Sequence, residues 1–585
     1  MCGIFGVTAD PDAANTILEG LKRLEYRGYD SWGIAVKNKS HFNLDKHVGK
    51  ISVSRTSLPK SSFGIGHTRW ATHGGVTQKN APPHLDCTKK IVVVHNGIID
   101  NWEALKKSLK VHTFISQTDS EIVAHLLEDK LKQTRDLFTA ATDIFKRLEG
   151  FNALLVAHID YPYIVAFKTG SPLVIGVNPG NHLISSDVSS LLPHTKKIIF
   201  LEDGQIAKIS PDSISLYTFP KLSPLKPKIT TIDWTVTAAQ KGAFPHFMLK
   251  EIHEQPEILT RLSQSKQPET KHLAAAIKAA KGIFTVACGS AAHAAHEGEY
   301  IFSKVAHLHL NHAIGSEFYY YANFLNKNSL CIALSQSGET IDTLQSVAAA
   351  LKQHAKTYAL LNVKGSSLDR LSDHSLCLDV GPEKAVASTK AFLAKVALLY
   401  LTAYQFIHRP KLAQKQLSLA AKTISQVLSP RNSKLIKKVA IKIKSVPSLF
   451  VLGRGQSYPA ALEIALKIKE ISYIHTEGFP SGELKHGVIA LIQRGTPTIV
   501  VAPLDETYAD IISGAIEVKA RGGLIIGISP RNNPVFDYHL PFSDCGDVSF
   551  FPAVVIGQLL AYHLAILRGF DPDMPRNLAK AVTVK

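Results

Sequence analysis

An internal repeat in the second half of the chain constrains the fold more than any other feature of the sequence. Three pairs of apolar segments recur at an offset of 166 or 167 residues, beginning at Phe284 and Phe450, at Cys331 and Thr498, and at Tyr358 and Ile525. Each segment precedes a turn and a helical pattern, which is typical of strand–helix units around a parallel sheet. We therefore predict two copies of one doubly wound domain, at residues 274–413 and 440–576.

The region before the repeat has a different pattern, in which short strands outnumber helices. The expected strands are Gly3–Val7, Gly33–Val36, Gly64–His67, Ile91–His95, Ala153–His158, Tyr163–Phe167 and Ile198–Leu201, and the expected helices are Asn15–Tyr26 and Asp119–Lys132. Four prolines between positions 211 and 227 then mark a linker. We expect an α/β protein with a strand-rich domain at residues 2–208, a linker at 209–245, the two repeated domains and a tail at 577–585.

Composition and charge narrow the functional classes. The 585 residues are 45% hydrophobic and 19% charged, which is typical of a folded protein. The formal net charge is +18, but the densest basic segment, Lys434–Lys444, has the spacing of an amphipathic helix, so we expect no nucleic-acid partner. The N-terminus lacks a signal-peptide pattern, and polar residues interrupt the most apolar stretch, Ala385–Tyr404. We therefore expect a cytoplasmic protein with no membrane partner.

The six cysteines are scattered along the chain and form no Cys-x-x-Cys pair. In a long cytosolic chain this spacing indicates reduced thiols rather than disulfides or a zinc site. His293 and His296 are three residues apart, but no third ligand is evident, and we interpret them as ordinary helix positions. The sequence thus predicts no metal and no cofactor.

The two repeated domains differ in the turn that follows their second strand. The first copy has Ser335-Gln-Ser-Gly-Glu-Thr340, where hydroxyl groups, an amide and backbone N–H groups precede a helix and suit a phosphate. The second copy has Ala502-Pro-Leu-Asp-Glu-Thr507, which loses hydroxyls and one N–H and gains a negative charge. We predict one phosphate site per chain, in the first copy; the alternative is a serine-rich turn without a ligand.

Cys2 stands where an N-terminal nucleophile would be. Removal of Met1 would leave the α-amine of Cys2 beside its own thiol, and that amine can act as the activating base. The alternative is a small buried cysteine. Polar residues in the segments 64–74, 95–97 and 118–121 are candidate partners for the thiol.

Several long motifs resemble known families. The segments Met1–Gly6, Arg27–Ser31, Gly66–Gly74, His95–Gly97 and Thr118–Asp119 resemble the class II glutamine amidotransferase domain. The segments Leu334–Thr340, Val386–Lys390, Lys469–His475, Gly482–Gly487 and Pro575–Lys580 resemble paired sugar-isomerase (SIS) domains. Together they resemble, over essentially the whole chain, the family of glutamine–fructose-6-phosphate aminotransferases. The resemblance implies an Ntn-hydrolase-type αββα glutaminase domain followed by two doubly wound SIS domains.

For the glutaminase half, the resemblance implies that Cys2 attacks the side-chain amide of L-glutamine and forms a thioester. Asn96 and the backbone N–H of Gly97 would form the oxyanion hole. The implied glutamine-binding residues are Arg69 for the α-carboxylate, Asp119 for the α-ammonium, Thr72 and His73 in the pocket wall, and Trp70 as a gate on the ammonia path. For Asp119 by itself, a helix N-cap is the alternative.

For the SIS half, the resemblance implies conversion of fructose 6-phosphate to glucosamine 6-phosphate, the first step of UDP-N-acetylglucosamine synthesis. The implied sugar-phosphate ligands are Ser290, Ser335, Gln336, Ser337, Thr340, Val386, Ala387, Ser388, Lys467 and Ala579. Lys580 would form a Schiff base with the C2 carbonyl, and Glu470 would move the proton between C1 and C2. His486 would open the sugar ring from the other subunit, which implies a homodimer.

Spacing adds one expectation about these residues. Glu463, Lys467 and Glu470 are four and three residues apart, so we expect them on one helix face; a surface salt-bridge row is the alternative. Two residues depart from the family pattern, because Ala291 stands where a second hydroxyl is usual and Trp32 where a small residue is usual. Two rival functions stay open: transfer to another sugar phosphate, and a sugar-phosphate-binding regulator without turnover.

Overall fold

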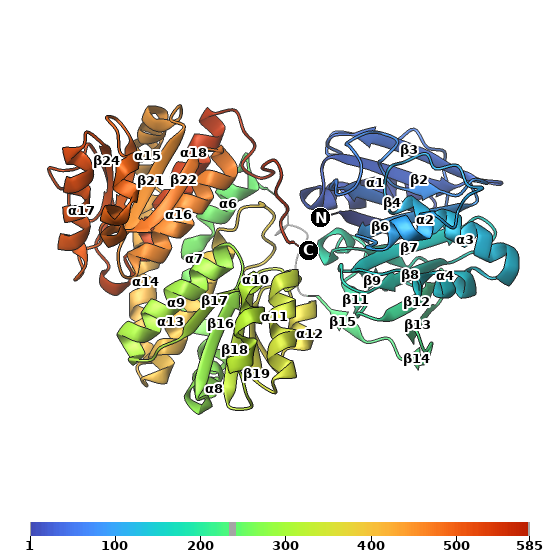
Figure 1. The fold of residues 1–585 in the computed structure, drawn as a ribbon, viewed down its shortest axis with the longest axis horizontal. Coiled ribbons are helices and arrows are strands. Elements are labelled where there is room, and N and C mark those ends of the chain that lie inside the picture. Colours follow the sequence, from blue (N-terminus) through green and yellow to red (C-terminus); the bar gives the residue numbers. More distant parts are fainter. Residues whose placement is uncertain (1, 233–240, 583–585) are drawn as a thin grey trace. The chain divides into compact units, whose positions relative to one another are not determined.

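The computed structural model describes residues 2–232 and 241–582. The chain divides into two compact units, which we describe one at a time (Figure 1). The first unit is the N-terminal part of the chain, with residues 365–367 and the C-terminal residues from Ala579 grouped with it. The second unit holds the rest of the chain up to Leu578.

Two antiparallel sheets stack face to face in the first unit. Their strand orders are β15-β11-β9-β10-β1-β4-β2-β3 and β14-β13-β12-β8-β7-β6-β5. The strands are β1 (Gly3–Val7), β2 (Ser31–Lys37), β3 (Phe42–Val48), β4 (Gly64–Arg69), β5 (His84–Leu85), β6 (Ile91–Gly97), β7 (Asn152–His158), β8 (Ile164–Lys168), β9 (Val174–Gly176), β10 (Leu183–Ser185), β11 (Lys197–Phe200), β12 (Gln205–Ile209), β13 (Ile214–Thr218), β14 (Pro224–Leu225) and β15 (Ile229–Thr231). Inward-facing apolar side chains of both sheets, among them Ile4, Ile65, Val92 and Leu155, form one buried core between them.

Helices cover the outer faces of these two sheets (Figure 1). They are α1 (Ala13–Leu24), η1 (Glu25–Arg27), α2 (Trp102–Lys106), α3 (Glu121–Thr134), α4 (Leu137–Phe145) and α5 (Val188–Leu191). Helix α1 buries Ile17 and Leu21 against the eight-stranded sheet, whereas α3 buries Ile122 against the seven-stranded sheet. The predicted αββα layering is confirmed.

The second unit contains two five-stranded parallel sheets with equivalent strand orders, β17-β16-β18-β19-β20 and β22-β21-β23-β24-β25. The strands are β16 (Gly282–Ala287), β17 (Asn311–Ile314), β18 (Ser329–Ser335), β19 (Lys356–Leu361), β20 (His374–Cys377), β21 (Ser448–Gly453), β22 (His475–Pro480), β23 (Pro497–Val501), β24 (Leu524–Ser529) and β25 (Tyr538–Pro541). The segments matched in the sequence repeat are the corresponding strands of the two sheets. Two copies of one doubly wound domain are therefore confirmed.

Helices flank both parallel sheets. They are α6 (Phe247–His253), α7 (Gln255–Ser265), α8 (Gln267–Ala279), α9 (Ser290–Ala306), α10 (Gly315–Phe318), η3 (Tyr319–Phe324), α11 (Ile341–Lys352), α12 (Ser367–Leu371), α13 (Lys390–Phe406), α14 (Pro410–Val427), α15 (Pro430–Ile443), α16 (Ser457–Ser472), η4 (Ser481–His486), η5 (Val488–Leu491), α17 (Tyr508–Ala520), η6 (Gly546–Val548) and α18 (Phe550–Leu567). Helices α9, α13, α16 and α18 contribute to one continuous apolar core. The two copies thus pack as one body.

Helix α18 corrects an expectation about apolar stretches. Gly546–Leu567 has the length and composition of a membrane span, whereas Ala385–Tyr404 was expected to be the most apolar stretch. Helix α18 itself, Phe550–Leu567, contains no Asp, Glu, Lys or Arg. Because 83% of its most apolar 18-residue stretch is buried inside the fold, the helix has the environment of a core helix.

Three strands lie in the segment expected to be a linker. Strand β13 pairs with β12, β14 with β13, and β15 with β11. The prediction of a linker at 209–245 is therefore wrong for the residues up to Thr231. Pro224 is tolerated because β14 is an edge strand, where a missing N–H breaks no ladder. Residues 233–240 of that segment lie outside the described residues.

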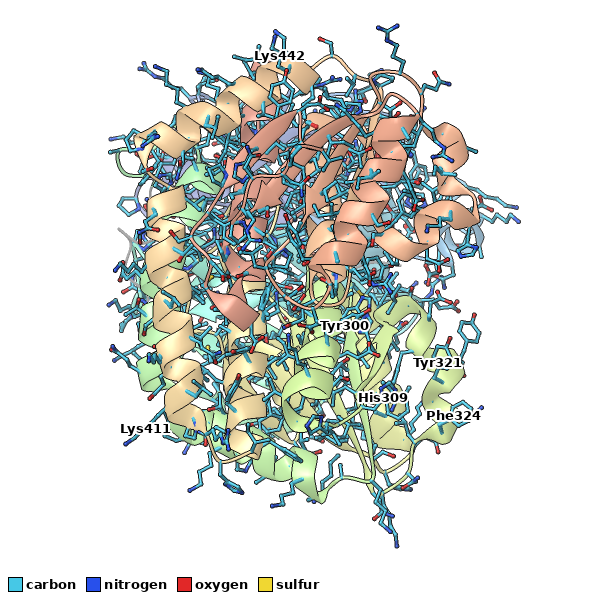
Figure 2. All side chains as sticks on the ribbon, turned by 90° about the vertical axis from the view of Figure 1, so that its left-hand side faces the viewer. Tyr300, His309, Tyr321, Phe324, Lys411 and Lys442 are labelled. Carbon is cyan, nitrogen blue, oxygen red and sulfur yellow. The ribbon has the colours of Figure 1, made fainter. Side chains whose placement is uncertain are left out.

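Helix α15 has the amphipathic form predicted for the basic segment. It buries Ile436 and Val439, while Lys434 and Lys438 are exposed. Figure 2 shows Lys442 extending from the same helix into solvent. The lysines therefore form a solvated face.

Candidate active sites

The first candidate site surrounds Cys2, immediately before β1. Antiparallel pairing of β1 with β4 places Gly3 opposite Thr68, so the end of β4 lies beside Cys2. The Trp70 N–H donates to Cys2 Sγ at 3.2 Å, and Asn96 Nδ2 donates to the Cys2 carbonyl at 3.0 Å. Burial raises the pKa of the Cys2 thiol, so the thiol needs a base to become a nucleophile.

His67, on β4, fixes the orientation of the Asn96 amide. Its Nε2 lies 2.9 Å from the His95 carbonyl and 3.0 Å from Asn96 Oδ1. Two acceptors around Nε2 assign the proton to that nitrogen, and the bond to Oδ1 turns Nδ2 toward Cys2. Burial lowers the pKa of His67 to about 3, which keeps the ring neutral. This role of His67 was not predicted, although a histidine within a strand expected to be buried was a visible signal.

We expect His67→Leu to lower the kcat of glutamine hydrolysis by roughly 10- to 100-fold, because the Asn96 amide loses its fixed orientation. The change in KM should be small. His67→Gln keeps an N–H donor and should recover part of the rate. Steady-state kinetics of both variants, beside the control His158→Gln in the same domain, would measure this. Equal rates for wild type and His67→Leu would remove His67 from the site.

Arg69 ends β4 and holds the loop that follows it. Its guanidinium donates to the carbonyl oxygens of His73, Gly74 (3.1 Å) and Gly75 (3.0 Å). Gly74 has φ +73°, a backbone conformation that favours glycine. Thr72 and His73 lie on this loop, Thr72 exposed and His73 half-buried. Arg69 therefore organises the segment predicted to line the glutamine pocket.

Asp119 is buried just before α3. Its Oδ2 accepts from the Ile99 N–H at 2.8 Å, so it braces the segment that follows β6. The N-cap of α3 is Ser120, and that side chain makes no capping bond, so the N-cap alternative for Asp119 is wrong. Gly97 has φ +141°, and a Cβ there would lie 2.1 Å from the Phe151 carbonyl oxygen. Only glycine fits at this position.

The aromatic and acidic side chains around Trp70 complete this region. The Tyr29 and Trp70 rings meet edge to face with centroids 5.7 Å apart. Asp30 Oδ2 accepts from the Ala71 N–H at 2.9 Å. Asp30 was not singled out from the sequence, although it lies inside the quoted Arg27–Ser31 motif. It fixes the turn that presents Trp70.

Trp32, the departure from the family pattern, lies elsewhere in the same domain. Its side chain is buried in the cluster that packs under α1. The indole stacks on His47 of the neighbouring strand, with centroids 4.6 Å apart. The substitution therefore changes packing in the outer layer.

The second candidate site is the turn after β18. Ser335 Oγ accepts from the Gly338 N–H at 3.0 Å and lies 3.1 Å from Thr340 Oγ1. Ser337 Oγ accepts from the Glu339 N–H at 3.1 Å. Thr340 is the N-cap residue of α11 but makes no side-chain capping bond. The loop is thus shaped by its own hydroxyls at the positive end of a 12-residue helix, as an anion site requires.

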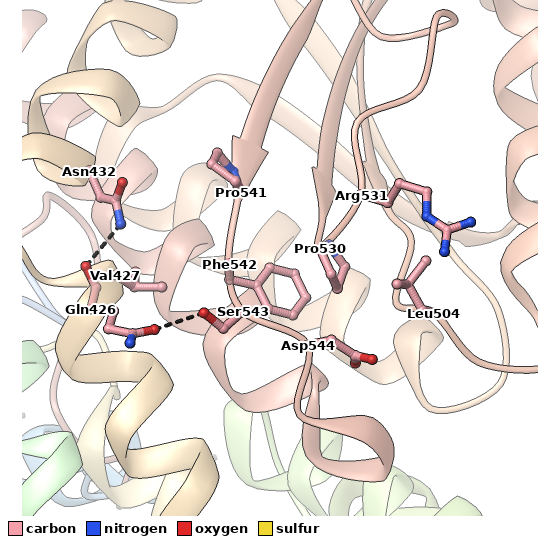
Figure 3. A pocket seen from close by; sticks show the side chains of 10 residues that line it. All are labelled: Gln426, Val427, Asn432, Leu504, Pro530, Arg531, Pro541, Phe542, Ser543 and Asp544. Atoms are coloured by element: carbon pink, nitrogen blue, oxygen red, sulfur yellow. Dashed lines mark hydrogen bonds between the residues drawn. The ribbon is translucent and has the colours of Figure 1, made fainter.

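The second copy has a different pocket at the carboxyl ends of its strands. Figure 3 shows this pocket, of about 520 Å³, with Leu504, Pro530 and Phe542 in its wall. The hydroxyl of Ser543 donates to Gln426 Oε1 at 2.8 Å, and the Asp544 carboxylate also lines the space. The Arg531 side chain lines the pocket as well, so its charged groups are of both signs, and the prediction of a phosphate site in the first copy alone stays a prediction.

The segment Val386–Ser388 is fixed by two carboxylate-bearing residues. The Val386 N–H donates to the Asp573 carbonyl at 3.0 Å. Glu383 accepts from the Ser388 hydroxyl at 3.2 Å and from the Thr389 N–H at 3.0 Å. Glu383 was not identified from the sequence. It holds the start of α13 and the backbone of the predicted sugar-binding segment.

A buried ionic network joins α9 of the first copy to α16 of the second. Lys467 Nζ lies 3.3 Å from Glu463 Oε1, contacts Glu470 Oε1, and donates to Ser290 Oγ at 2.9 Å. His293 Nδ1 lies 2.8 Å from Glu463 Oε2. The three α16 side chains therefore share one helix face as predicted, and since Glu463 and Lys467 are 0% exposed, the surface-row alternative is wrong.

The lysine and the carboxylates of this network shift each other's pKa values toward the charged forms. Burial alone would lower the pKa of Lys467, but Glu463 and Glu470 raise it above its ordinary value. Burial likewise works against the Glu463 carboxylate, yet Lys467 and His293 lower its pKa. His293 is thus more than the ordinary helix position expected, because it is a partner of a buried carboxylate.

The remaining predicted residues lie apart from this network or in the terminal segment. His486 is exposed at the end of η4. Ala579 and Lys580 are half-buried and belong to the terminal segment grouped with the first unit. Their assignments to the sugar site stay predictions.

Comparison with known proteins identifies the domains that carry the two candidate sites. The sequence matches the family described as glutamine amidotransferase domain over residues 67–193, and the SIS domain family over residues 276–404 and 442–535. The fold and the matches define a glutamine amidotransferase joined to a pair of SIS domains.

Full-length relatives define the family more closely. A glutamine–fructose-6-phosphate aminotransferase (isomerizing) of Thermus thermophilus is 39% identical over 614 residues, covering 100% of both chains. The protein of that name from Thermococcus kodakarensis is 39% identical over 604 residues with the same coverage. The solved C-terminal domain of glucosamine-fructose-6-phosphate aminotransferase from Francisella tularensis covers 57% of this chain and 99% of its own, with 35% identity and a TM-score of 0.53. The chain belongs to the family of glutamine–fructose-6-phosphate aminotransferases, which are enzymes.

Proposed function

We propose that this chain transfers the amide nitrogen of glutamine to fructose 6-phosphate and isomerises the product, giving glucosamine 6-phosphate and glutamate in the cytoplasm. One observation supports the proposal. The chain matches glutamine–fructose-6-phosphate aminotransferases from end to end, and it has both the site around Cys2 and the hydroxyl-lined turn at Ser335–Thr340. Glutamine and fructose 6-phosphate are its substrates.

In the glutaminase reaction, the Cys2 thiol attacks the side-chain carbonyl of glutamine after its own α-amine has taken the thiol proton. Ammonia leaves as the thioester forms, and water then releases glutamate. Negative charge develops on the carbonyl oxygen, and Asn96 Nδ2 with the Gly97 N–H stabilises it. His67 supports this step because it keeps the Asn96 amide in the required orientation.

In the sugar reaction, the Ser335–Thr340 turn binds the phosphate and Lys580 forms a Schiff base with C2. Ammonia replaces the lysine nitrogen at C2. Glu470 then moves a proton between C1 and C2, which converts the ketose imine into the aldose amine. Lys467 contacts Glu470 and holds this carboxylate in place.

We propose that a homodimer completes the sugar site, because His486 of the partner subunit would enter it. His486 is exposed on its own chain, as a residue that acts in trans must be before assembly. A surface apolar patch at the end of β17 and on η3 fits such an interface, and its members are Ile314, Tyr319, Tyr320, Tyr321 and Phe324. Figure 2 shows Tyr321 and Phe324 projecting from the surface. Light scattering of the purified chain measures the assembly mass.

The function is tested by incubating the purified chain with glutamine and a set of sugar phosphates. We expect glucosamine 6-phosphate from fructose 6-phosphate, with one glutamate for each aminated sugar. Amination of a different sugar phosphate would favour the rival acceptor. Binding of fructose 6-phosphate without glutamate release would favour the regulator.

We expect Trp70→Ala to keep much of the glutaminase activity but to lose coupling. Ammonia that reaches water is protonated and diluted, so its transfer needs a shielded path. The Trp70 backbone N–H contacts the Cys2 sulfur, and the large indole of the same residue can block escape and then swing aside. Measured together, glutamate should exceed glucosamine 6-phosphate by a wide margin in this variant, whereas Trp102→Ala should stay coupled. Equal product yields in Trp70→Ala would make Trp70 a packing residue.

A further inference from the structure

A second cluster of reactive side chains lies in the glutaminase domain, away from Cys2 in the sequence. Cys87 comes from the turn between β5 and β6, His112 from the segment between α2 and α3, and His125 and Glu128 from α3. One ligand atom from each, a sulfur, two Nδ1 atoms and a carboxylate oxygen, lies within 4.8 Å of all the others. The side chains of His112, His125 and Glu128 are only 2%, 1% and 11% exposed.

Four distances among these atoms are close to the edges of a tetrahedral metal site. Cys87 Sγ lies 3.6 Å from Nδ1 of His112 and 3.6 Å from Nδ1 of His125. Glu128 Oε2 lies 3.3 Å and 3.8 Å from the same two nitrogens. Zinc bonds of about 2.3 Å to sulfur and about 2.0 Å to nitrogen or oxygen give tetrahedral edges of roughly 3.5 Å and 3.3 Å.

An outer carboxylate orients the His112 ring, because His112 Nε2 lies 2.9 Å from Asp129 Oδ2. His125 Nε2 makes no hydrogen bond within the described residues but lies 3.6 Å from Glu121 Oε1, which favours a proton on that nitrogen. With a proton on Nε2, each ring has its Nδ1 lone pair facing the cluster, the arrangement that accompanies metal-bound histidines. Two imidazole lone pairs, a sulfur and a carboxylate oxygen then face one another. A cation satisfies all four electron-pair donors at once.

We propose that Cys87, His112, His125 and Glu128 bind one zinc ion with a structural role. Four protein ligands fill a tetrahedral shell and leave no position for substrate, unlike a catalytic zinc site. The ion ties the β5–β6 turn and the segment before α3 to α3 itself. Because α3 begins two residues after Asp119, the ion stabilises the platform that carries this predicted glutamine ligand.

The sequence analysis predicted no metal because these ligands lack a recognisable spacing. Cys87 and His112 are 25 residues apart and come from separate segments, and only His125 and Glu128 have a helical spacing. The fold alone brings the four together. The proposal does not depend on the acceptor sugar, so it stands or falls separately from the proposed function.

The zinc content of the purified full-length chain tests the proposal. We expect about one equivalent of tightly bound zinc per chain, or uptake of one equivalent by chain that has been treated with chelator and then given zinc chloride. Cys87→Ala and His125→Ala should lose this zinc, and Asp129→Asn should weaken zinc binding by about 10- to 100-fold. The controls Cys377→Ser and His475→Asn, which lie outside the cluster, should keep it.

A second measurement keeps the test decisive if a ligand variant folds poorly. Cobalt(II) bound to wild-type chain should show a thiolate-to-metal absorption band, which Cys87→Ser should lack. Zinc should also protect Cys87 from alkylation and raise the melting temperature of the wild-type chain. No zinc uptake by the wild type, or zinc content unchanged in Cys87→Ala, would overturn the proposal.

Discussion

Replacement of Cys2 by alanine is expected to abolish glutamine hydrolysis, with a loss of at least ~10⁴-fold in kcat, because the variant has no nucleophile. Isomerisation of fructose 6-phosphate to glucose 6-phosphate should persist, since the residues predicted for it lie in the SIS domains and the C-terminal tail and do not include Cys2. Glutamate release and sugar isomerisation are therefore measured on the same preparation. Alanine at Cys377, a thiol in the first SIS domain, is the matched control and should leave glutaminase turnover unchanged.

The same loss is expected when Met1 stays on the chain. The α-amine of Cys2 is then part of an amide and cannot accept the thiol proton. Burial holds the thiol pKa above its ordinary value, so no appreciable thiolate forms without that base. Glutaminase turnover in a chain with a retained N-terminal extension would contradict this activation mechanism, and turnover in Cys2→Ala would remove Cys2 as nucleophile.

The second large effect is expected for Lys467→Met. Lys467 is the buried cation between Glu463 and Glu470, so its removal leaves the buried Glu463 with His293 as its cationic contact and takes a cation away from the half-buried Glu470. Breaking a buried ion pair costs about 3–5 kcal/mol of unfolding free energy. We expect that loss in denaturant unfolding, together with loss of sugar turnover, because Glu470 and Ser290 lose a shared contact.

Two further variants separate burial from charge in this network. Glu463→Gln combined with Lys467→Met should recover part of the stability, because the buried Glu463 carboxylate that has lost its lysine is then replaced by a neutral amide. Lys22→Met breaks an exposed pair with Glu19 and should change the unfolding free energy by less than about 1 kcal/mol. If Lys467→Met is as stable as Lys22→Met, the ionic network does not stabilise the packing of α9 against α16.

Much of the fold could be predicted because it follows from local patterns. The strand Gly3–Val7 has the predicted bounds, and the other six predicted strands of the first domain are all present with small shifts at their ends. The repeat predicted two equivalent sheets because both copies conserve the apolar strands of one topology. The strands β3, β5, β9, β10 and β12–β15 were missed. All of these except the seven-residue β3 have only two to five residues, and such segments carry little periodicity.

The sites were predicted less completely, because their supporting contacts join distant segments. Motifs identified Cys2 and Asn96, but nothing in the spacing shows that His67 turns the Asn96 amide. The α16 face was predictable from intervals of three and four residues. Its partner His293 comes from a helix 170 residues away in the sequence, so the pairing depends on how the two copies pack.

The central claim is that one chain moves nitrogen from glutamine to fructose 6-phosphate, and nitrogen tracing tests it most directly. The purified chain is incubated with fructose 6-phosphate, amide-¹⁵N-glutamine and an excess of unlabelled ammonium, and the amino-sugar product is analysed by mass spectrometry. We predict glucosamine 6-phosphate that carries the ¹⁵N label at its amino group, with one glutamate formed for each product molecule. Release of glutamate without an aminated sugar, or an amino group drawn from the unlabelled ammonium, would contradict the account.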